Sequence, residues 1–311
     1  MSTGEVPAVY EPAFAALSRS GELAARTLAA YDVLQSCELC GRQCKVDRTR
    51  SARGAGCRTG LLARVDGFDI DRNFEACLSG PGGAGVVRFS YCNLRCRTCA
   101  TSEIRQRGRG RETTPERIAE GMLSLQEAGA DHLVLERPSH VIPQVLASIE
   151  IAAGRGLSLP VVYDSGGYDH PTGLSLLAGV IDIYVVAVKF GNSGAGRQIA
   201  RVRDYSAKNR VALAEMHRQV GDLEVDDDGL ARRGLLVRHQ VLPNGQSHPG
   251  PVFRFLAEKI SKNTALRLIG GFEPVYQSEQ LPMLRRAVTP EEFARVEALA
   301  DRHGLRRRLP S

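Results

Sequence analysis

The stretch Val86-Val-Arg-Phe-Ser-Tyr-Cys-Asn-Leu-Arg-Cys-Arg-Thr-Cys99 joins a short apolar run to three closely spaced cysteines. The run Val86–Ser90 predicts a buried β-strand. Cys92, Cys96 and Cys99 follow at once, so we expect them on the loop that leaves this strand. In parallel α/β folds, chemistry gathers on the loops at the C-terminal ends of the strands. The stretch therefore predicts the first strand of such a fold together with its functional site.

Five more short apolar runs alternate with amphipathic helical patterns, which is typical of parallel βα units. The runs are His132–Leu135, Pro160–Tyr163, Ile181–Val188, Leu235–Leu242 and Ala265–Ile269. Two helix starts are well marked. Thr114 precedes a proline, and Thr289-Pro-Glu-Glu292 adds a capping-box glutamate. Six strands with connecting helices predict an α/β fold, a partial (β/α)6 TIM-like barrel.

The chain has 311 residues, 43% of them hydrophobic, which is enough for one sizeable core. Residues 1–30 are alanine-rich and predict a helical lead-in. Residues 37–57 hold cysteine and arginine with little apolar periodicity, which indicates a segment that needs a metal to fold. We expect a Cys-rich N-terminal extension over residues 1–80 and a core barrel with a C-terminal helix over residues 81–311.

The charge pattern favours neither nucleic acid nor membrane as a partner. The net charge is +6, but the basic residues are scattered among 35 acidic ones, and aromatic residues are few. The N-terminus lacks a secretory pattern, and the most apolar stretch, Val180–Val188, is short and carries Asp182. We therefore expect a cytoplasmic protein. In that reducing compartment, eight clustered cysteines favour metal binding over disulfides.

Three thiolates on the loop of Cys92, Cys96 and Cys99 can hold three irons of a four-iron cluster and leave the fourth iron open. An open, strongly reducing iron can inject an electron into a sulfonium. A structural zinc site would need a fourth ligand, and the following residues Ala-Thr-Ser-Glu-Ile104 include neither Cys nor His. The spacing thus favours an iron–sulfur cluster over zinc.

A second group, Cys37, Cys40, Cys44 and Cys57, offers four thiolates. Four thiolates close off either an auxiliary iron–sulfur cluster or a zinc ion, so a structural or electron-relay role is favoured over catalysis. The residues leave both metals open, as well as unmetallated thiols. Cys77 is left over, and we expect a buried thiol that packs as a small hydrophobe.

Beyond the block Cys77–Ile104, further blocks follow in an order that resembles radical S-adenosylmethionine (SAM) proteins of the pyruvate formate-lyase-activating-enzyme-like branch. They are Pro138–Gln144, Val162–Tyr168, Asp182–Tyr184, Met216–Gly221, Arg233–His239 and Leu242-Pro243. The resemblance runs from Cys37 to about Gly304. It implies a 4Fe–4S cluster on the three cysteines and SAM bound at the open iron through its amino and carboxylate groups. Reductive cleavage would yield a 5′-deoxyadenosyl radical that abstracts hydrogen from a substrate.

Seven further residues are implied in cofactor binding by the resemblance. They are Ser139 and His140 after the second strand, Asp164 and Ser165 at the end of the third, Lys189 at the end of the fourth, and Arg238 and His239 on the fifth. Taken without the resemblance, His140 reads equally well as a helix-cap residue and His239 as a satisfied core histidine.

The chain departs from the family at three positions that line the pocket in relatives. Thr98 replaces an aromatic residue, Ala187 an acidic one, and Gly270-Gly271 a glutamine. These changes favour a small-molecule or peptide substrate over a protein partner activated by a glycyl radical. An electron donor such as flavodoxin or ferredoxin is implied.

Two alternatives accompany this interpretation. The basic run Arg105–Arg111 either grips an anionic substrate or redox partner or is a solvated loop, which we favour. As a function of a different class, both cysteine groups would hold structural zinc in a non-catalytic module.

Overall fold

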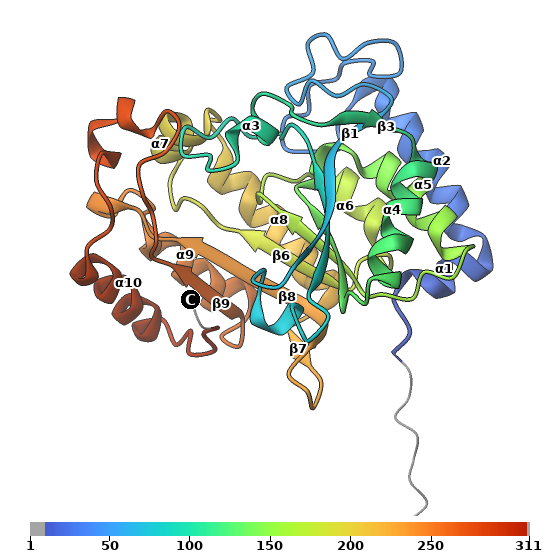
Figure 1. The fold of residues 1–311 in the computed structure, drawn as a ribbon. Helices are drawn as coiled ribbons and strands as arrows, with labels where there is room; N and C mark the ends of the chain where they lie inside the picture. Colours follow the sequence, from blue (N-terminus) through green and yellow to red (C-terminus); the bar gives the residue numbers. More distant parts are fainter. Residues whose placement is uncertain (1–9, 310–311) are drawn as a thin grey trace, which may run out of the picture.

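Six parallel strands form the centre of the computed structural model, which describes residues 10–309 (Figure 1). In chain order they are β2 (Ala84–Phe89), β4 (His132–Glu136), β5 (Val161–Ser165), β6 (Ile183–Ala187), β8 (Ala231–Gln240) and β9 (Ala265–Ile269). Each pairs in parallel with the next along the chain. Among the described residues no pairing joins β9 back to β2. The predicted α/β fold, a partial and open (β/α)6 barrel, is confirmed.

Sequence analysis did not predict β1 (Ala63–Asp71), which pairs antiparallel with β2 and with the short β3 (Arg111–Thr113). Its sequence, ARVDGFDID, carries four charged residues because most of the strand is only partly buried. A bulge between Val65 and Gly67 bends it. β1 belongs to the expected 1–80 extension but is hydrogen-bonded into the core sheet. The boundary at residues 80 and 81 stays a prediction. A short β7 (Glu224–Val225) pairs with β8.

Helices surround the outside of the curved sheet (Figure 1). They include α4 (Pro115–Glu127), α5 (Ile142–Ala153), α6 (Pro171–Leu177), α8 (Tyr205–Val220), α9 (Pro249–Phe255) and α10 (Pro290–Arg302). The expected lead-in forms α1 (Phe14–Ser20) and α2 (Glu22–Asp32), and both pack on α5. The first nine residues of that lead-in, and the last two of the expected core domain, lie outside the described residues.

Alternate strand residues divide between two apolar clusters, because successive side chains of a strand point to opposite faces. Val87, Leu133 and Tyr163 belong to the large cluster that packs under the helices. Val86 and Val134, one residue away, belong to a second cluster on the inner side of the barrel, together with residues 77 and 78. The inner side is therefore a packed layer at this level of the barrel.

The predicted capping box at α10 is present. Thr289 Oγ1 accepts from the backbone N–H of Glu292 at 3.2 Å, and the Glu292 carboxylate accepts from the Thr289 N–H at 3.1 Å. We expect Thr289→Ala to lower the free energy of unfolding by about 1 kcal/mol in urea titrations, since the helix loses a cap. Thr114 is the matched control. It occupies the same position at α4 but accepts no backbone N–H, so Thr114→Ala should cost clearly less.

Candidate functional site

The loop after β2 is held in place from both sides. Tyr91 adopts a left-handed conformation (φ 63°), and its N–H bonds to the carbonyl of Ile104 in α3 (Ser102–Arg105) at 3.0 Å. On the other side, the N–H of Arg97 bonds to the carbonyl of Ile199 at 2.8 Å, in the π-helical turn η4 (Gly196–Ala200). The three cysteines of this loop therefore stand on a braced segment at the C-terminal end of the first parallel strand, as predicted.

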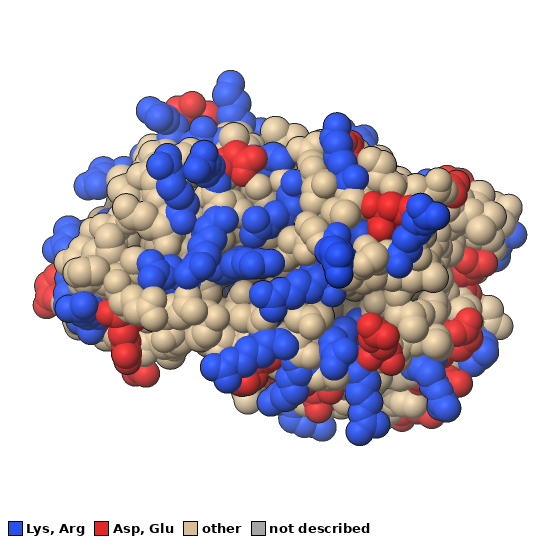
Figure 2. All heavy atoms as spheres, turned by 90° about the horizontal axis from the view of Figure 1, so that it is seen from above, with Lys and Arg blue, Asp and Glu red and all other residues tan. Residues whose placement is uncertain are grey.

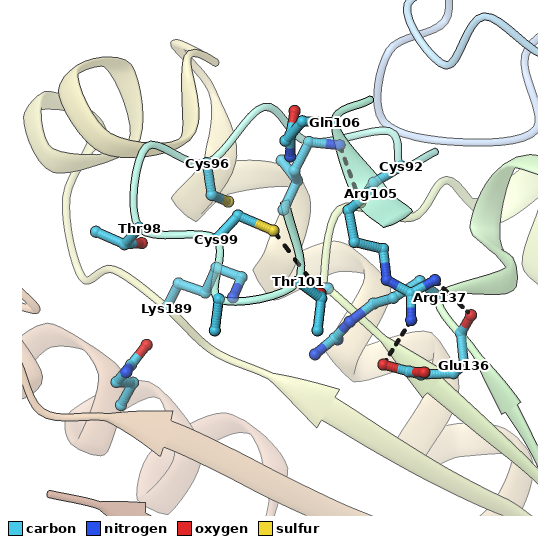
Figure 3. Close-up of a pocket in the computed structure, with 14 residues that line it drawn as sticks. Cys92, Cys96, Thr98, Cys99, Thr101, Arg105, Gln106, Glu136, Arg137 and Lys189 are labelled. Atoms are coloured by element: carbon cyan, nitrogen blue, oxygen red, sulfur yellow. Dashed lines mark hydrogen bonds and ion pairs between the residues drawn. The ribbon is translucent and has the colours of Figure 1, made fainter. Parts of the chain in front are cut away.

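Cys92, Cys96 and Cys99 line one cavity of about 280 Å³ (Figure 3). Strand ends supply much of the rest of its wall. They contribute Glu136 and Arg137 after β4, Gly166 after β5, Lys189 after β6 and Gln240 from β8. Thr98, one of the positions at which the sequence departs from the proteins that it resembles, lines the cavity.

The electrostatics of the cavity suit an anionic group. Burial raises the pKa of Cys96 to about 11, and Lys189 and Arg137 act in the opposite direction. Burial also raises the pKa of Cys92, while Arg137 and Arg105 lower it. Nη1 of Arg137 is buried and lies 3.4 Å from Asp164 Oδ1 without the geometry of a hydrogen bond. Its N–H groups are therefore available to donate to a further anionic group.

These residues fit the donor set of an iron–sulfur cluster. Three thiols share one loop, and cations beside them favour the thiolate form that ligates iron. Across residues 10–309, no three Cys, His, Asp or Glu side chains are gathered closely enough to hold a single metal ion. A 4Fe–4S cluster does not need such a grouping, because each of the three thiolates would bind a different iron.

A charged layer lies on the inner side of the barrel, two residues beyond the inner apolar cluster. Arg88, Glu136 and Asp164 are in register across β2, β4 and β5, and Arg238 and Arg267 are in register across β8 and β9. Glu136 pairs with Arg88 at 3.3 Å, and Asp164 pairs with Arg238 at 3.2 Å. The strand ends thus form a network of ion pairs beside the cavity.

Glu75 completes this network from outside the strands. Its carboxylate, 2% exposed, lies 2.5 Å from Arg238 Nε and 2.6 Å from Arg267 Nη1. The Arg238 guanidinium also lies 4.7 Å from the ring centroid of Phe74. The segment that carries these residues leads into the 3-10 turn η2 (Ala76–Leu78), whose Leu78 packs in the inner apolar cluster. The segment therefore covers part of the inner side of the open barrel. Sequence analysis did not predict this contact.

The structure brings some of the predicted cofactor-binding residues to the cavity and not others. Lys189 lines the cavity, and Asp164 and Arg238 pair with each other next to it. Ser165 Oγ instead donates to Asp169 and accepts from the N–H of Gly167 at 2.8 Å, which shapes the turn after β5.

Ser139 is buried as well, in the turn after β4. Both predicted histidines are buried behind the wall of the cavity. His140 Nε2 contacts the carbonyl of Ser90 at 3.0 Å, and His239 Nδ1 contacts the carbonyl of Val188 at 2.7 Å. The contact of His239 matches the core interpretation. The contact of His140 does not match a helix cap, because it joins the ring to the residue after β2. A role of either histidine in cofactor binding stays a prediction.

The burial of His239 should make stability depend on pH. Burial lowers the pKa of His239 from 6.5 to about 4, so between these values the unfolded chain binds a proton that the native protein does not. Stability from this group is therefore present above pH 6.5 and falls as the pH drops towards 4. From about pH 7 to about pH 5, we expect it to lower the free energy of unfolding by about 2 kcal/mol.

The control for this effect is His239→Gln, whose amide can still donate to the Val188 carbonyl but does not titrate. Urea titrations of both proteins at the two pH values isolate the contribution. An identical pH dependence in both would rule it out.

Three residues that line the cavity, Glu136, Arg137 and Gln240, were not among the predicted site residues. Glu136 ends β4 and Arg137 follows it, and Gln240 is the neighbour of the predicted residue His239. The period-two alternation of a strand decides which of two neighbours faces the site. Gln240 points to the cavity, so its neighbour His239 points away. Arg137 has one local sign, a left-handed conformation (φ 61°), which only the structure reveals.

The expectation of a solvated loop at Arg105–Arg111 is wrong for Arg105, whereas Arg107, Arg109 and Arg111 are exposed as expected. Arg105 is buried and pairs with Glu136 at 2.5 Å. Arg109 pairs with Asp66 of β1 at 2.7 Å, and Arg111 begins β3. The acidic partners come from distant strands, so the basic run is fixed structure along much of its length.

The second cysteine group surrounds a buried arginine. Arg48 is 1% exposed, and its guanidinium donates to Cys37 Sγ at 3.3 Å and to the carbonyls of Thr59 and His140 at 2.7 and 2.8 Å. Among the described residues no carboxylate pairs with it. A buried cation needs a nearby anion, and thiolates of a metal centre would supply it. The donor set thus fits a metal on Cys37 and its neighbours.

Two hydrogen bonds join the segments that carry the two cysteine groups. Arg42 Nε donates to the carbonyl of Asn93 at 2.7 Å, and Arg95 Nη2 donates to the carbonyl of Gly56 at 3.2 Å. Each bond links residues next to or near cysteines of both groups. The segment that holds Cys57 therefore lies against the loop that holds Cys96, which the sequence did not predict.

Comparisons with known proteins give limited matches. No protein-family model matches the chain. It is 26% identical over 164 residues to the uncharacterized protein MJ0674 of Methanocaldococcus jannaschii, a match that covers 52% of this chain and 44% of that protein. The chain therefore matches less than half the length of this relative.

Two solved structures overlay on part of the fold. A radical SAM methyltransferase from Sphaerobacter thermophilus gives a TM-score of 0.45 at 15% identity and covers 71% of this chain and 64% of its own. HydG, a maturase of FeFe-hydrogenase, gives 0.48 at 15% identity, with 70% and 48% covered. Because both scores are below 0.5, functional arguments rest on the residues of this chain. Within residues 10–309, no helix combines the length and apolarity needed to cross a membrane.

Proposed function

We propose that the protein is a radical SAM enzyme. The observation that carries this proposal is the braced loop of Cys92, Cys96 and Cys99 at the end of the first of six parallel strands, facing a cavity with Arg137 and Lys189. Parallel barrels place their chemistry at this end of the strands. Three thiolates that leave one iron without a protein ligand suit a cluster that binds and reduces a further ligand.

In this proposal the trio of thiolates holds a 4Fe–4S cluster, and SAM binds beside it. The bound cofactors supply reductive cleavage of SAM to a 5′-deoxyadenosyl radical, which abstracts hydrogen from a substrate carbon. The chain provides cations at the wall of the cavity, where Arg137 and Lys189 can bind the carboxylate of SAM.

We favour a small-molecule or peptide substrate. The ion-paired layer of Asp164, Arg238 and Glu75 narrows the inner side of the barrel, and Thr98 leaves room near the cluster where a larger side chain is expected in the family. Activation of a protein partner through a glycyl radical is the second candidate. It is favoured by the resemblance of the sequence to activating enzymes. A non-catalytic zinc module is the alternative outcome.

For the second cysteine group we propose a closed metal centre, either an auxiliary iron–sulfur cluster or zinc. The support is the buried Arg48, which donates to Cys37 and needs an anionic counterpart. Metal analysis after anaerobic purification separates the two metals.

The test is anaerobic reconstitution with iron and sulfide, followed by dithionite and SAM. The proposal expects a brown protein with iron–sulfur charge-transfer absorption that releases 5′-deoxyadenosine. A colourless zinc protein that cleaves no SAM would overturn it. Deuterium transfer from labelled candidate substrates into 5′-deoxyadenosine then identifies the substrate class, and transfer from a protein partner would favour the activase.

A further inference from the structure

Five arginines form a group around the two cysteine loops, and none of them makes an ion pair within the described residues. They are Arg42, Arg58, Arg95, Arg97 and Arg201, which we call the arginine patch. Figure 2 shows the molecule from above, and on this face Lys and Arg form a broad band across the surface. Arg58, Arg95 and Arg201 are exposed, and the other two are half-buried.

Three arginines of the patch donate hydrogen bonds to neutral oxygen acceptors. Arg95 donates to the carbonyl of Gly56, Arg97 to the amide oxygen of Gln280 at 2.8 Å, and Arg201 to the amide oxygen of Gln277 at 3.1 Å. Backbone bonds place these segments side by side. The N–H of Arg97 bonds to the carbonyl of Ile199 at 2.8 Å and the N–H of Arg95 to the carbonyl of Ala200, next to Arg201, at 3.3 Å. Cations this close repel one another.

Several arginines elsewhere on the surface do have acidic partners. Arg109 pairs with Asp66, and Arg286 with Glu292 at 2.7 Å. A set of mutually repelling cations without such partners costs free energy in the isolated protein. An acidic partner would relieve this repulsion, and complementary charge of this kind steers association and sets its salt dependence.

The patch lies where a partner would approach both cysteine groups. Arg95 is the neighbour of Cys96, and Arg58 is the neighbour of Cys57. Cys92 and Cys99 are themselves partly exposed. A partner docked on the patch would thus meet the protein at the short path from solvent to the proposed cluster.

We propose that the arginine patch docks an acidic one-electron carrier protein. The carrier loses one electron and the cluster on the cysteine trio gains it, so the transfer balances without a further reagent. This inference rests on the proposed radical SAM function and adds the surface through which the enzyme is reduced. Flavodoxin and ferredoxin are acidic carriers of the implied class and serve as the probes.

The experiment compares two reductants on the reconstituted protein with SAM and measures 5′-deoxyadenosine. For the double variant Arg58→Glu/Arg95→Glu, we expect the rate driven by reduced flavodoxin to fall by about tenfold or more, with the dithionite-driven rate within about twofold of the unmodified protein. Arg155→Glu is the matched control. Arg155 is exposed and forms no ion pair among the described residues. It lies in the turn before β5, at the N-terminal ends of the parallel strands, whereas the loop of the cysteine trio follows the C-terminal end of β2.

Salt provides a second measurement that needs no variant. Raising NaCl from about 50 to about 300 mM should lower the flavodoxin-driven rate of the unmodified protein several-fold and leave the dithionite-driven rate nearly constant.

Four outcomes would overturn the proposal. In the first, the double variant loses both rates equally, which would make the patch part of the site itself. In the second, its flavodoxin-driven rate is unchanged. In the third, neither flavodoxin nor ferredoxin drives turnover where dithionite does. In the fourth, the patch binds tRNA while carrier-driven turnover does not depend on it. If no reductant yields 5′-deoxyadenosine, the proposed function itself fails, and that result is distinct from these four.

Discussion

A Cys96→Ser variant is expected to form 5′-deoxyadenosine at a rate at least about 100-fold below that of the unmodified protein. Cys96 is the most buried of the three loop cysteines, at 8% exposed, and lies between the other two in sequence. A serine hydroxyl does not ionise near neutral pH and ligates iron poorly, so the cluster would keep only two thiolate ligands. Iron and sulfide content and the nucleoside product are measured together after anaerobic reconstitution.

Cys77→Ala is the matched control for this prediction. Cys77 is also buried, but it packs in the inner apolar cluster, and burial raises its pKa to about 11, so it remains a neutral thiol. This agrees with the expected small hydrophobe. The variant should keep the iron content and the turnover of the unmodified protein. Full iron and full turnover in Cys96→Ser would contradict the assignment of the trio.

Glu75→Gln should lower the free energy of unfolding by about 3 kcal/mol, because loss of this buried carboxylate leaves two partly buried cations without their shared counter-charge. The carboxylate of Glu75 reaches both Arg238 and Arg267, whereas a neutral amide offers one weak acceptor. Arg238 would still have Asp164, at 3.2 Å, but Arg267 has no other acidic partner in the described part of the chain. Urea titration under anaerobic conditions measures the loss.

The same change at Glu127 provides the comparison. Glu127 is exposed near the end of α4 and forms no ion pair among the described residues. Glu127→Gln should therefore change the free energy of unfolding by less than about 0.5 kcal/mol. If Glu75→Gln is equally mild, charge does not hold the segment before η2 against the inner side of the barrel.

The sequence was sufficient for the features that depend on neighbouring residues. Short apolar runs predicted all six parallel strands, and Thr289 with Glu292 predicted a helix start. The spacing of the three cysteines, directly after a strand, predicted that they share one loop. These features are local, since strand alternation, capping and short ligand spacings are set within a few residues.

Only the tertiary structure decided which residues meet across the barrel. Glu75 and Arg238 are 163 positions apart, and no local pattern marks either of them as a partner of the other. Gln240 faces the cavity because of the register of β8, which also turns His239 into the core, and Arg137 lines the cavity from the left-handed turn that follows β4. Contacts of this kind depend on how the strands pair and curve, so they exist only once the chain has folded.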